Sequence, residues 1–155
     1  MDNSFRWLHL SDFHIGKDNY GQIKLFKYLH EHMRQNKEKG LIPDAVFITG
    51  DIANKGQADE YYIFLKEFIE PLSEIYESLP HIYMVPGNHD IDREQCEQAA
   101  KSLYDILEEA GSKFFDADET GLKKRGEIIP RFENFQHFVG KAGEDICFPV
   151  KSIFD

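Results

Sequence analysis

The sequence predicts an α/β protein in which short parallel strands alternate with helices. Three apolar runs have the composition of buried strands, namely residues 5–10, 45–49 and 82–85. Between them, apolar residues recur at helical spacing over residues 23–33 and again over residues 61–69. This β-α-β-α-β order implies a parallel sheet with right-handed crossovers.

Both intervening helices have recognisable boundaries. The first should end at Gly40, because glycine is favoured just beyond a helix C-terminus. Its buried stripe is expected to consist of Ile23, Phe26, Leu29 and Met33. His30 and His32 are expected on the helix surface. The second helix should begin near Gln57 and be kinked or restarted by Pro71. Its expected buried face consists of Tyr61, Phe64, Leu65, Phe68 and Ile69.

The C-terminal part of the sequence differs in character, and residues 91–145 are predicted to form a helical, cap-like insertion. Within it we expect a helix over residues 94–110 and a mobile, polar loop over residues 111–126. Pro130 should open a further helix, and residues 146–150 could form a strand or an extended edge. The whole chain, 1–155, is predicted to be a single domain with a substantial core.

Composition and charge exclude several classes of protein. The formal charge of −10 argues against broad, nonspecific binding to nucleic acid, which needs a basic surface. Cys96 and Cys147 lie in unrelated contexts, so free thiols in a reducing compartment are expected. No signal peptide is recognisable, and no window approaches 18 apolar residues. We therefore expect a cytoplasmic protein with no membrane partner.

Each predicted strand ends in side chains that can bind a cation. Asp12 and His14 follow the first strand, Asp51 follows the second, and Asn88 follows the third. Because ligands in open α/β sheets bind at the carboxyl ends of the strands, these side chains are expected to share one edge. The set contains oxygen and imidazole ligands without a thiolate, which suits Mn, Fe or Zn.

Such a ligand set is suited to phosphoester chemistry. Two cations about 3.5–4 Å apart can activate a bridging water and hold both oxygens of an in-line displacement at phosphorus. Asp51 could bridge the two ions, and Asn88 could donate an oxygen to the second. His89 could then be a proton donor, with Asp90 as its orienting partner. Taken singly, an aspartate, histidine or Gly-Asp pair at a strand end is more often a cap or a turn. Their joint occurrence after three strands is what indicates a catalytic site.

The three ligand-bearing segments, LHLSDFH at 8–14, GDIAN at 50–54 and GNHD at 87–90, resemble the first three of five motifs of the calcineurin-like metallophosphoesterase superfamily. The resemblance covers roughly residues 5–90, with motif spacing typical of the small phosphodiesterase branch. It implies the N-terminal part of a four-layer αββα sandwich with a dinuclear metal centre at its edge. It also implies that Asp12 and His14 bind the first metal, Asp51 bridges both, Asn88 binds the second, and His89 lies at the scissile ester.

Two departures from the family pattern affect the expected activity. Asn54 stands where some phosphatases of the family have an aspartate, which weakens a protein-phosphatase interpretation. The family also completes its metal centre with a later histidine and a Gly-His-x-His pair, whereas only His137 follows Asp90 in this sequence. His137 lies in a Phe-rich helical pattern and is expected to be a surface or packing residue. We therefore expect the chain to be part of a longer protein, and the isolated 155 residues could be inactive.

The expected function is a dinuclear metal-dependent phosphoester hydrolase, a phosphodiesterase in which a metal-bridging hydroxide attacks phosphorus. Its expected cofactors are two divalent metal ions, Mn²⁺ in the first place and Fe or Zn as alternatives. The substrate would be a phosphoester, either a small molecule or a nucleic acid. One alternative is a nuclease of the same type, with residues 91–145 selecting the substrate. The other is a noncatalytic binding or scaffold module, which an incomplete ligand set would favour.

Overall fold

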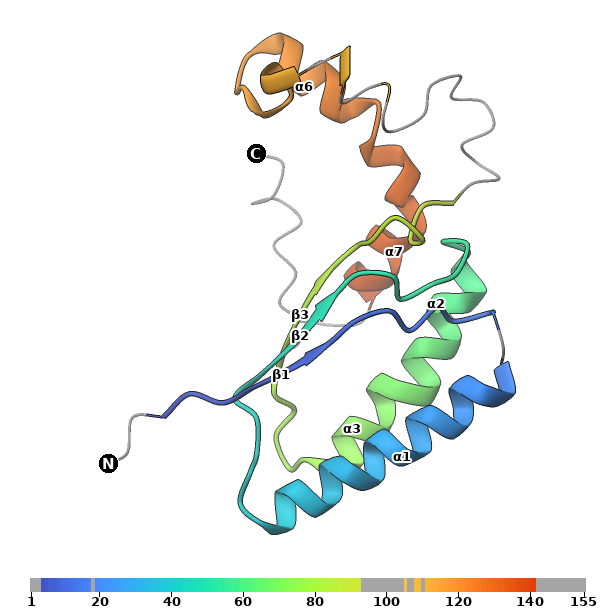
Figure 1. Ribbon diagram of the computed structural model, residues 1–155, viewed down its shortest axis with the longest axis vertical. Helices are drawn as coiled ribbons and strands as arrows, with labels where there is room; N and C mark the ends of the chain where they lie inside the picture. The colour runs from blue at the N-terminus through green and yellow to red at the C-terminus, as the bar shows by residue number, and fades with distance from the viewer. Residues whose placement is uncertain (1–3, 18, 93–104, 106–107, 110, 142–155) are drawn as a thin grey trace.

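A three-stranded parallel sheet with strand order β1-β2-β3 forms the centre of the protein (Figure 1). Its strands are β1 (Trp7–Leu10), β2 (Ala45–Thr49) and β3 (His81–Val85). The predicted α/β class and parallel sheet are confirmed. The structure, a computed structural model, describes residues 4–17, 19–92, 105, 108–109 and 111–141.

Helices cover one face of this sheet (Figure 1). They are α1 (Asn19–Glu38), α2 (Ala58–Phe64), the π-helix η1 (Leu65–Ile69) and α3 (Glu70–Ile75). The strands direct alternate side chains toward them, so that Val46, Ile48 and Ile82 are completely buried. On the opposite face, Trp7 is 63% exposed and Tyr83 is 37% exposed. The described residues therefore contain one helical layer and one sheet, a part of the four-layer arrangement that the resemblance implies.

The helix boundaries in the structure agree well with those predicted from the sequence, whereas the burial of individual residues agrees less well. Gly40 follows α1 with a φ of +72°, and Gln57 is the N-cap of α2. His30, which was expected on the surface, is buried with its ring stacked between Phe26 and Phe68 at centroid distances of 6.5 and 5.7 Å. Burial lowers the pKa of His30. Ile23, expected in the core, is 50% exposed, because the buried stripe of α1 runs through Phe26, His30 and Met33 instead.

The predicted kink at Pro71 corresponds to a change of helix type. The π-helix η1 ends at Ile69, and Pro71 lies in the first turn of α3. The three segments α2, η1 and α3 nevertheless share one buried face. Tyr61, Phe64, Phe68 and Ile69 are all buried as predicted, and Leu65 is partly buried.

Residues 111–126 are folded, so the expectation of a mobile loop there is wrong. They form the 3₁₀-helix η2 (Gly111–Phe115) and the helix α6 (Glu119–Gly126). Asp118 caps α6 by accepting a hydrogen bond from the Gly121 N–H at 2.8 Å. Arg125 lies buried behind the same turn and donates to the Asp116 carbonyl at 3.0 Å. These polar contacts stabilise a segment that lacks a strong apolar pattern.

The predicted helix near Pro130 is present as η3 (Ile129–Phe132) followed by α7 (Glu133–Lys141). Phe135, Phe138 and Val139 join the main core, and His137 is exposed as expected. Most of the predicted helix 94–110 and the possible strand 146–150 lie outside the described residues. Among the described helices, none combines the length and the apolar character needed to cross a membrane.

Candidate metal centre

The loops that follow β1 and β2 run side by side beyond the ends of their strands. Their backbones stay paired, with the Asp12 N–H donating to the Gly50 carbonyl at 3.2 Å and the His14 N–H to the Asp51 carbonyl at 2.9 Å. An isolated parallel bridge between Ile15 and Ala53 extends the pairing further. This arrangement brings the side chains of both loops to one edge of the sheet, as the sequence predicted.

Three predicted site residues converge at this edge. His14, Asp51 and His89 each offer a ligand atom, and these atoms all lie within 4.8 Å of one another. The rings of His14 and His89 meet edge to face, with centroids 4.6 Å apart. Asp12 lies beside them, with its Oδ1 3.7 Å from Nε2 of His14. Asn88 is an exposed residue of the same loop as His89, and its role as a ligand stays a prediction.

The backbone at these positions is in an unusual conformation. Asp12, His14 and Asp51 have φ values of 60°, 48° and 53°, and they are the residues other than glycine with positive φ in the described part of the chain. A left-handed conformation costs a residue with a Cβ about 1–3 kcal/mol and persists only where the surroundings impose it. Such conformations concentrate at functional sites, so their coincidence with three predicted ligands supports a binding role.

The donor atoms at this edge fit a divalent cation. Nδ1 of His14 is buried and has no hydrogen-bond partner among the described residues. Asp12 and Asp51 provide carboxylate oxygens, which are acceptors and need positive charge or donors nearby. Imidazole nitrogen together with carboxylate oxygen is a ligand combination for Mn, Fe or Zn. The residues present therefore fit a divalent metal ion.

His89 is oriented by two contacts to the loop that follows β2. Its backbone N–H donates to Oδ1 of Asp51 at 2.9 Å. Its Nδ1 lies 2.9 Å from the carbonyl oxygen of Asn54. Because a carbonyl only accepts, Nδ1 must bear a proton, which leaves Nε2 as the nitrogen available to a cation or a substrate. The predicted orienting partner, Asp90, does not make this contact; the Asn54 carbonyl does.

Asp90 instead lies beneath the site, completely buried. Its carboxylate accepts hydrogen bonds from the backbone N–H groups of Ile52, Ala53 and Gly87 and from the hydroxyl of Tyr61. Burial raises the pKa of Asp90, and these four hydrogen bonds oppose the rise. Removal from water, together with the nearby Asp90 carboxylate, raises the pKa of Tyr61 in turn, so its hydroxyl stays a donor.

Two further side chains of the site were not predicted from the sequence. Gln22, on α1, donates to the carbonyl of Phe13 at 3.1 Å and to that of His14, and accepts from the Gly16 N–H at 3.2 Å. Tyr61 was expected in the core, but not as a donor to a site residue. A glutamine in the first turns of a helix and a tyrosine on its buried face give no sequence signal of their partners. Their contacts depend on the fold.

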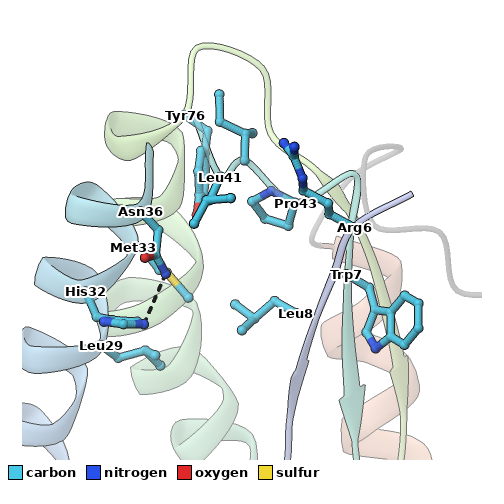
Figure 2. Close-up of a pocket in the computed structure, with 11 residues that line it drawn as sticks. Arg6, Trp7, Leu8, Leu29, His32, Met33, Asn36, Leu41, Pro43 and Tyr76 are labelled. Carbon is cyan, nitrogen blue, oxygen red and sulfur yellow. Dashed lines mark hydrogen bonds between the residues drawn. The ribbon is translucent and has the colours of Figure 1, made fainter. Parts of the chain in front are cut away.

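An apolar cavity lies away from these loops. A cavity of about 210 Å³ is lined by Leu8, Met33, Leu41 and Tyr76, at the amino ends of β1 and β2 (Figure 2). In Figure 2, Leu8 points toward α1, whereas Trp7 points away from it. The cavity is thus separated from the candidate metal centre by the length of the strands, and none of the predicted ligands lines it.

Gly87 is a position where the site tolerates no side chain. A Cβ at this residue would lie 2.2 Å from Oδ1 of Asp51 and 2.5 Å from the Asp51 backbone nitrogen. We expect Gly87→Ala to lower the free energy of unfolding by about 1–3 kcal/mol, because the two loops must separate. Urea denaturation measures this change. Gly126→Ala, where a Cβ meets nothing within 4 Å, is the control. Equal stability of the two variants would contradict the close packing of the loops.

Comparison with known proteins identifies the family to which the chain is similar. The sequence matches the calcineurin-like phosphoesterase family over residues 5–150. It is 38% identical over 86 residues to a cAMP/cGMP dual specificity phosphodiesterase of Mycobacterium tuberculosis, covering 54% of this chain and 26% of that protein. It is 36% identical over 89 residues to a probable glycerophosphodiester phosphodiesterase of Arcobacter nitrofigilis, covering 54% and 29% respectively.

A third relative extends the similarity along the chain. An uncharacterized metallophosphoesterase-like protein of Bacillus subtilis is 31% identical over 143 residues, covering 76% of this chain and 28% of that protein. The chain thus spans 26%, 28% and 29% of the length of these three relatives. Because the family match covers most of the sequence and includes every loop of the candidate metal centre, the chain belongs to the calcineurin-like phosphoesterase family.

Proposed function

We propose that this protein is a metal-dependent hydrolase of phosphodiesters. The observation on which the proposal depends is the convergence of ligand atoms from His14, Asp51 and His89 within 4.8 Å at the carboxyl edge of the sheet. The choice of phosphodiesters is supported by two relatives whose names describe phosphodiesterases. It is also supported by Asn54, which replaces the aspartate of some phosphatases in the family.

The residues that would hold the metal ions come from three loops. We propose that Asp12, His14 and Asp51 bind one divalent cation, and that Asp51 and Asn88 bind a second. Mn²⁺ is the proposed ion, with Fe or Zn as alternatives. When bound, such ions supply Lewis acidity to a phosphoryl oxygen and lower the pKa of a coordinated water. The first group of ligands contains three side chains and the second only two, so the first ion should bind more tightly.

His89 has the position of a proton donor in this proposal. The Asn54 carbonyl holds its Nδ1 at 2.9 Å, and the His14 ring meets its edge, so the imidazole has one defined orientation. Because Nδ1 already carries a proton, Nε2 can release one to the departing oxygen of the ester only from the imidazolium form, in which both ring nitrogens are protonated. Because the orienting group is a neutral carbonyl rather than a carboxylate, it fixes the ring without adding negative charge beside it.

Metal titration of the chain tests this proposal. We expect isothermal calorimetry with Mn²⁺ to reveal one better-formed site and one weaker site. His14→Ala should weaken the better site, because it removes one of three protein ligands. His32→Ala is the matched control, since His32 is an exposed histidine whose ring contacts Asn36 on α1 at 3.0 Å.

Repeating the titration with Zn²⁺ and Fe²⁺ distinguishes the proposed metals. Absence of binding for all three ions would contradict a metal-dependent function. So would binding by His14→Ala that equals binding by the wild-type chain. Two equally tight Mn²⁺ sites would contradict the unequal ligand sets, although not the presence of a metal centre.

A further inference from the structure

One buried carboxylate connects the two loops that present Asp51 and His89. Oδ1 of Asp90 accepts from the Ala53 N–H at 2.9 Å, and Oδ2 accepts from the Gly87 N–H at 2.8 Å. The Ile52 N–H also points at Oδ2, at 3.3 Å. Ile52 and Ala53 directly follow Asp51, and Gly87 lies two residues before His89. The spacing between the two ligand-bearing loops therefore depends on where the Asp90 carboxylate lies.

The hydroxyl of Tyr61 also contacts this carboxylate. It donates to Oδ1 of Asp90 at 3.0 Å and lies 3.3 Å from the Asp90 backbone oxygen. The side chain is only 1% exposed. Its ring stacks on Phe138 at 5.3 Å with an interplanar angle of 17°, and meets the edge of Phe135 at 6.0 Å. The side chain of Tyr61 is attached to α2 and its ring packs against α7, so the position of the hydroxyl depends on both helices.

The chemistry of this contact requires a carboxylate and a donor. Four donors converge on the two oxygens of Asp90, and an ionised carboxylate is the side chain that accepts at both oxygens. An amide in its place would direct an NH₂ group against at least one backbone N–H. The loops are also in direct contact, since a Cβ on Gly50 would lie 2.9 Å from the Gly87 Cα. A small shift of Asp90 would therefore change the separation of the loops.

We propose that Tyr61 is a positioning residue of the metal centre, acting through Asp90 to set the separation between Asp51 and His89. The inference rests on the proposed function for its metal, although the hydrogen bonds themselves need none. It gives α7 a role, because Phe138 holds the ring of Tyr61 in place. It also changes the role assigned to Asp90. Instead of orienting the His89 ring, Asp90 joins the two loops.

Tyr61→Phe removes the hydroxyl and keeps the ring, and two measurements follow its effect. In metal-free protein, we expect the amide protons of Ile52, Ala53 and Gly87 to exchange faster with solvent, with no change at Ile48 in β2. The Mn²⁺ affinity should fall by about 10-fold, the lower end of the range for residues that support metal ligands. Tyr62→Phe is the control, since Tyr62 is the next residue of α2 and is 61% exposed.

A second variant disturbs the position of Tyr61 without removing its hydroxyl. Phe138→Leu removes the ring that stacks on Tyr61 and should accelerate exchange of the same three amides to a smaller degree. Unchanged exchange at these amides in Tyr61→Phe would overturn the proposal. So would faster exchange throughout the sheet with unchanged Mn²⁺ affinity, which is the result of a purely structural role. A wild-type chain that binds no Mn²⁺ would contradict the proposed function instead, and amide exchange would still decide whether Tyr61 holds the loops.

Discussion

Asp51→Asn is expected to abolish measurable Mn²⁺ binding or to weaken it by more than about 100-fold. Loss of residues that merely support ligands already costs about 10–100-fold, and Asp51 is the residue proposed to contact both ions. Asparagine keeps the size of the side chain and one oxygen, which can still accept from the His89 N–H, now 2.9 Å from Oδ1. The amide then presents an NH₂ group, a donor, where a cation needs an oxygen.

Calorimetric titration measures this loss, and thermal unfolding of the metal-free protein separates it from damage to the fold. We expect the melting temperature of Asp51→Asn without metal to be no lower than that of the wild type, because the substitution removes a negative charge close to Asp12. Asp59→Asn is the matched control, since Asp59 is an exposed aspartate of α2. Wild-type Mn²⁺ affinity in Asp51→Asn would show that the carboxylate is not a ligand.

The position of the candidate site could be predicted from the sequence because it depends on local signals. Apolar runs that end in Ser11–Asp12 and in Gly50–Asp51 specify strands followed by turns. Parallel pairing of those strands then brings the turns together at one edge. The left-handed conformation of Asp51 was not predicted, although the preceding Gly50, with a φ of +95°, marks a turn that only glycine adopts easily.

Contacts between distant segments account for what the sequence did not reveal. Tyr61 and Asp90 are 29 residues apart, and the Asn54 carbonyl and the His89 ring are 35 residues apart. Neither pair produces a periodicity, because one hydrogen bond uses a buried hydroxyl and the other a backbone oxygen. The burial of His30 was missed for a similar reason, because it depends on packing against the rings of Phe26 and Phe68 rather than on the polarity of His30 itself.

Errors in the C-terminal part have a different cause. Residues 111–126 are polar overall and low in β-branched residues, so the composition favoured a loop. The helix α6 forms there because Asp118 caps its start and Arg125 satisfies carbonyls of the preceding turn. That residues 91–145 act as a cap over a substrate stays a prediction. The described part of the segment is helical and includes α7, which packs on Tyr61.

His89→Ala is expected to reduce the rate of phosphodiester hydrolysis by about 10²–10⁴-fold while leaving the bound metal in place. The substitution removes the ring whose Nδ1 is held by Asn54, but keeps the backbone N–H that donates to Asp51. The effect on rate should depend on the leaving group. A p-nitrophenolate departs without a proton, so the loss should be small for bis-p-nitrophenyl phosphate. An alkoxide needs a proton, so the loss should be large for a diester with an alkyl leaving group.

Rates with both substrates, together with the metal content, are compared in a form of the protein that turns over both esters. His137→Ala is the control, because His137 is an exposed histidine of α7. The proximity of His89 to His14 and Asp51 makes a second outcome chemically reasonable, in which the imidazole is itself a metal ligand. In that case His89→Ala would lose metal, and the two substrates would be impaired equally. Retained metal with a leaving-group-dependent loss of rate identifies His89 as the proton donor.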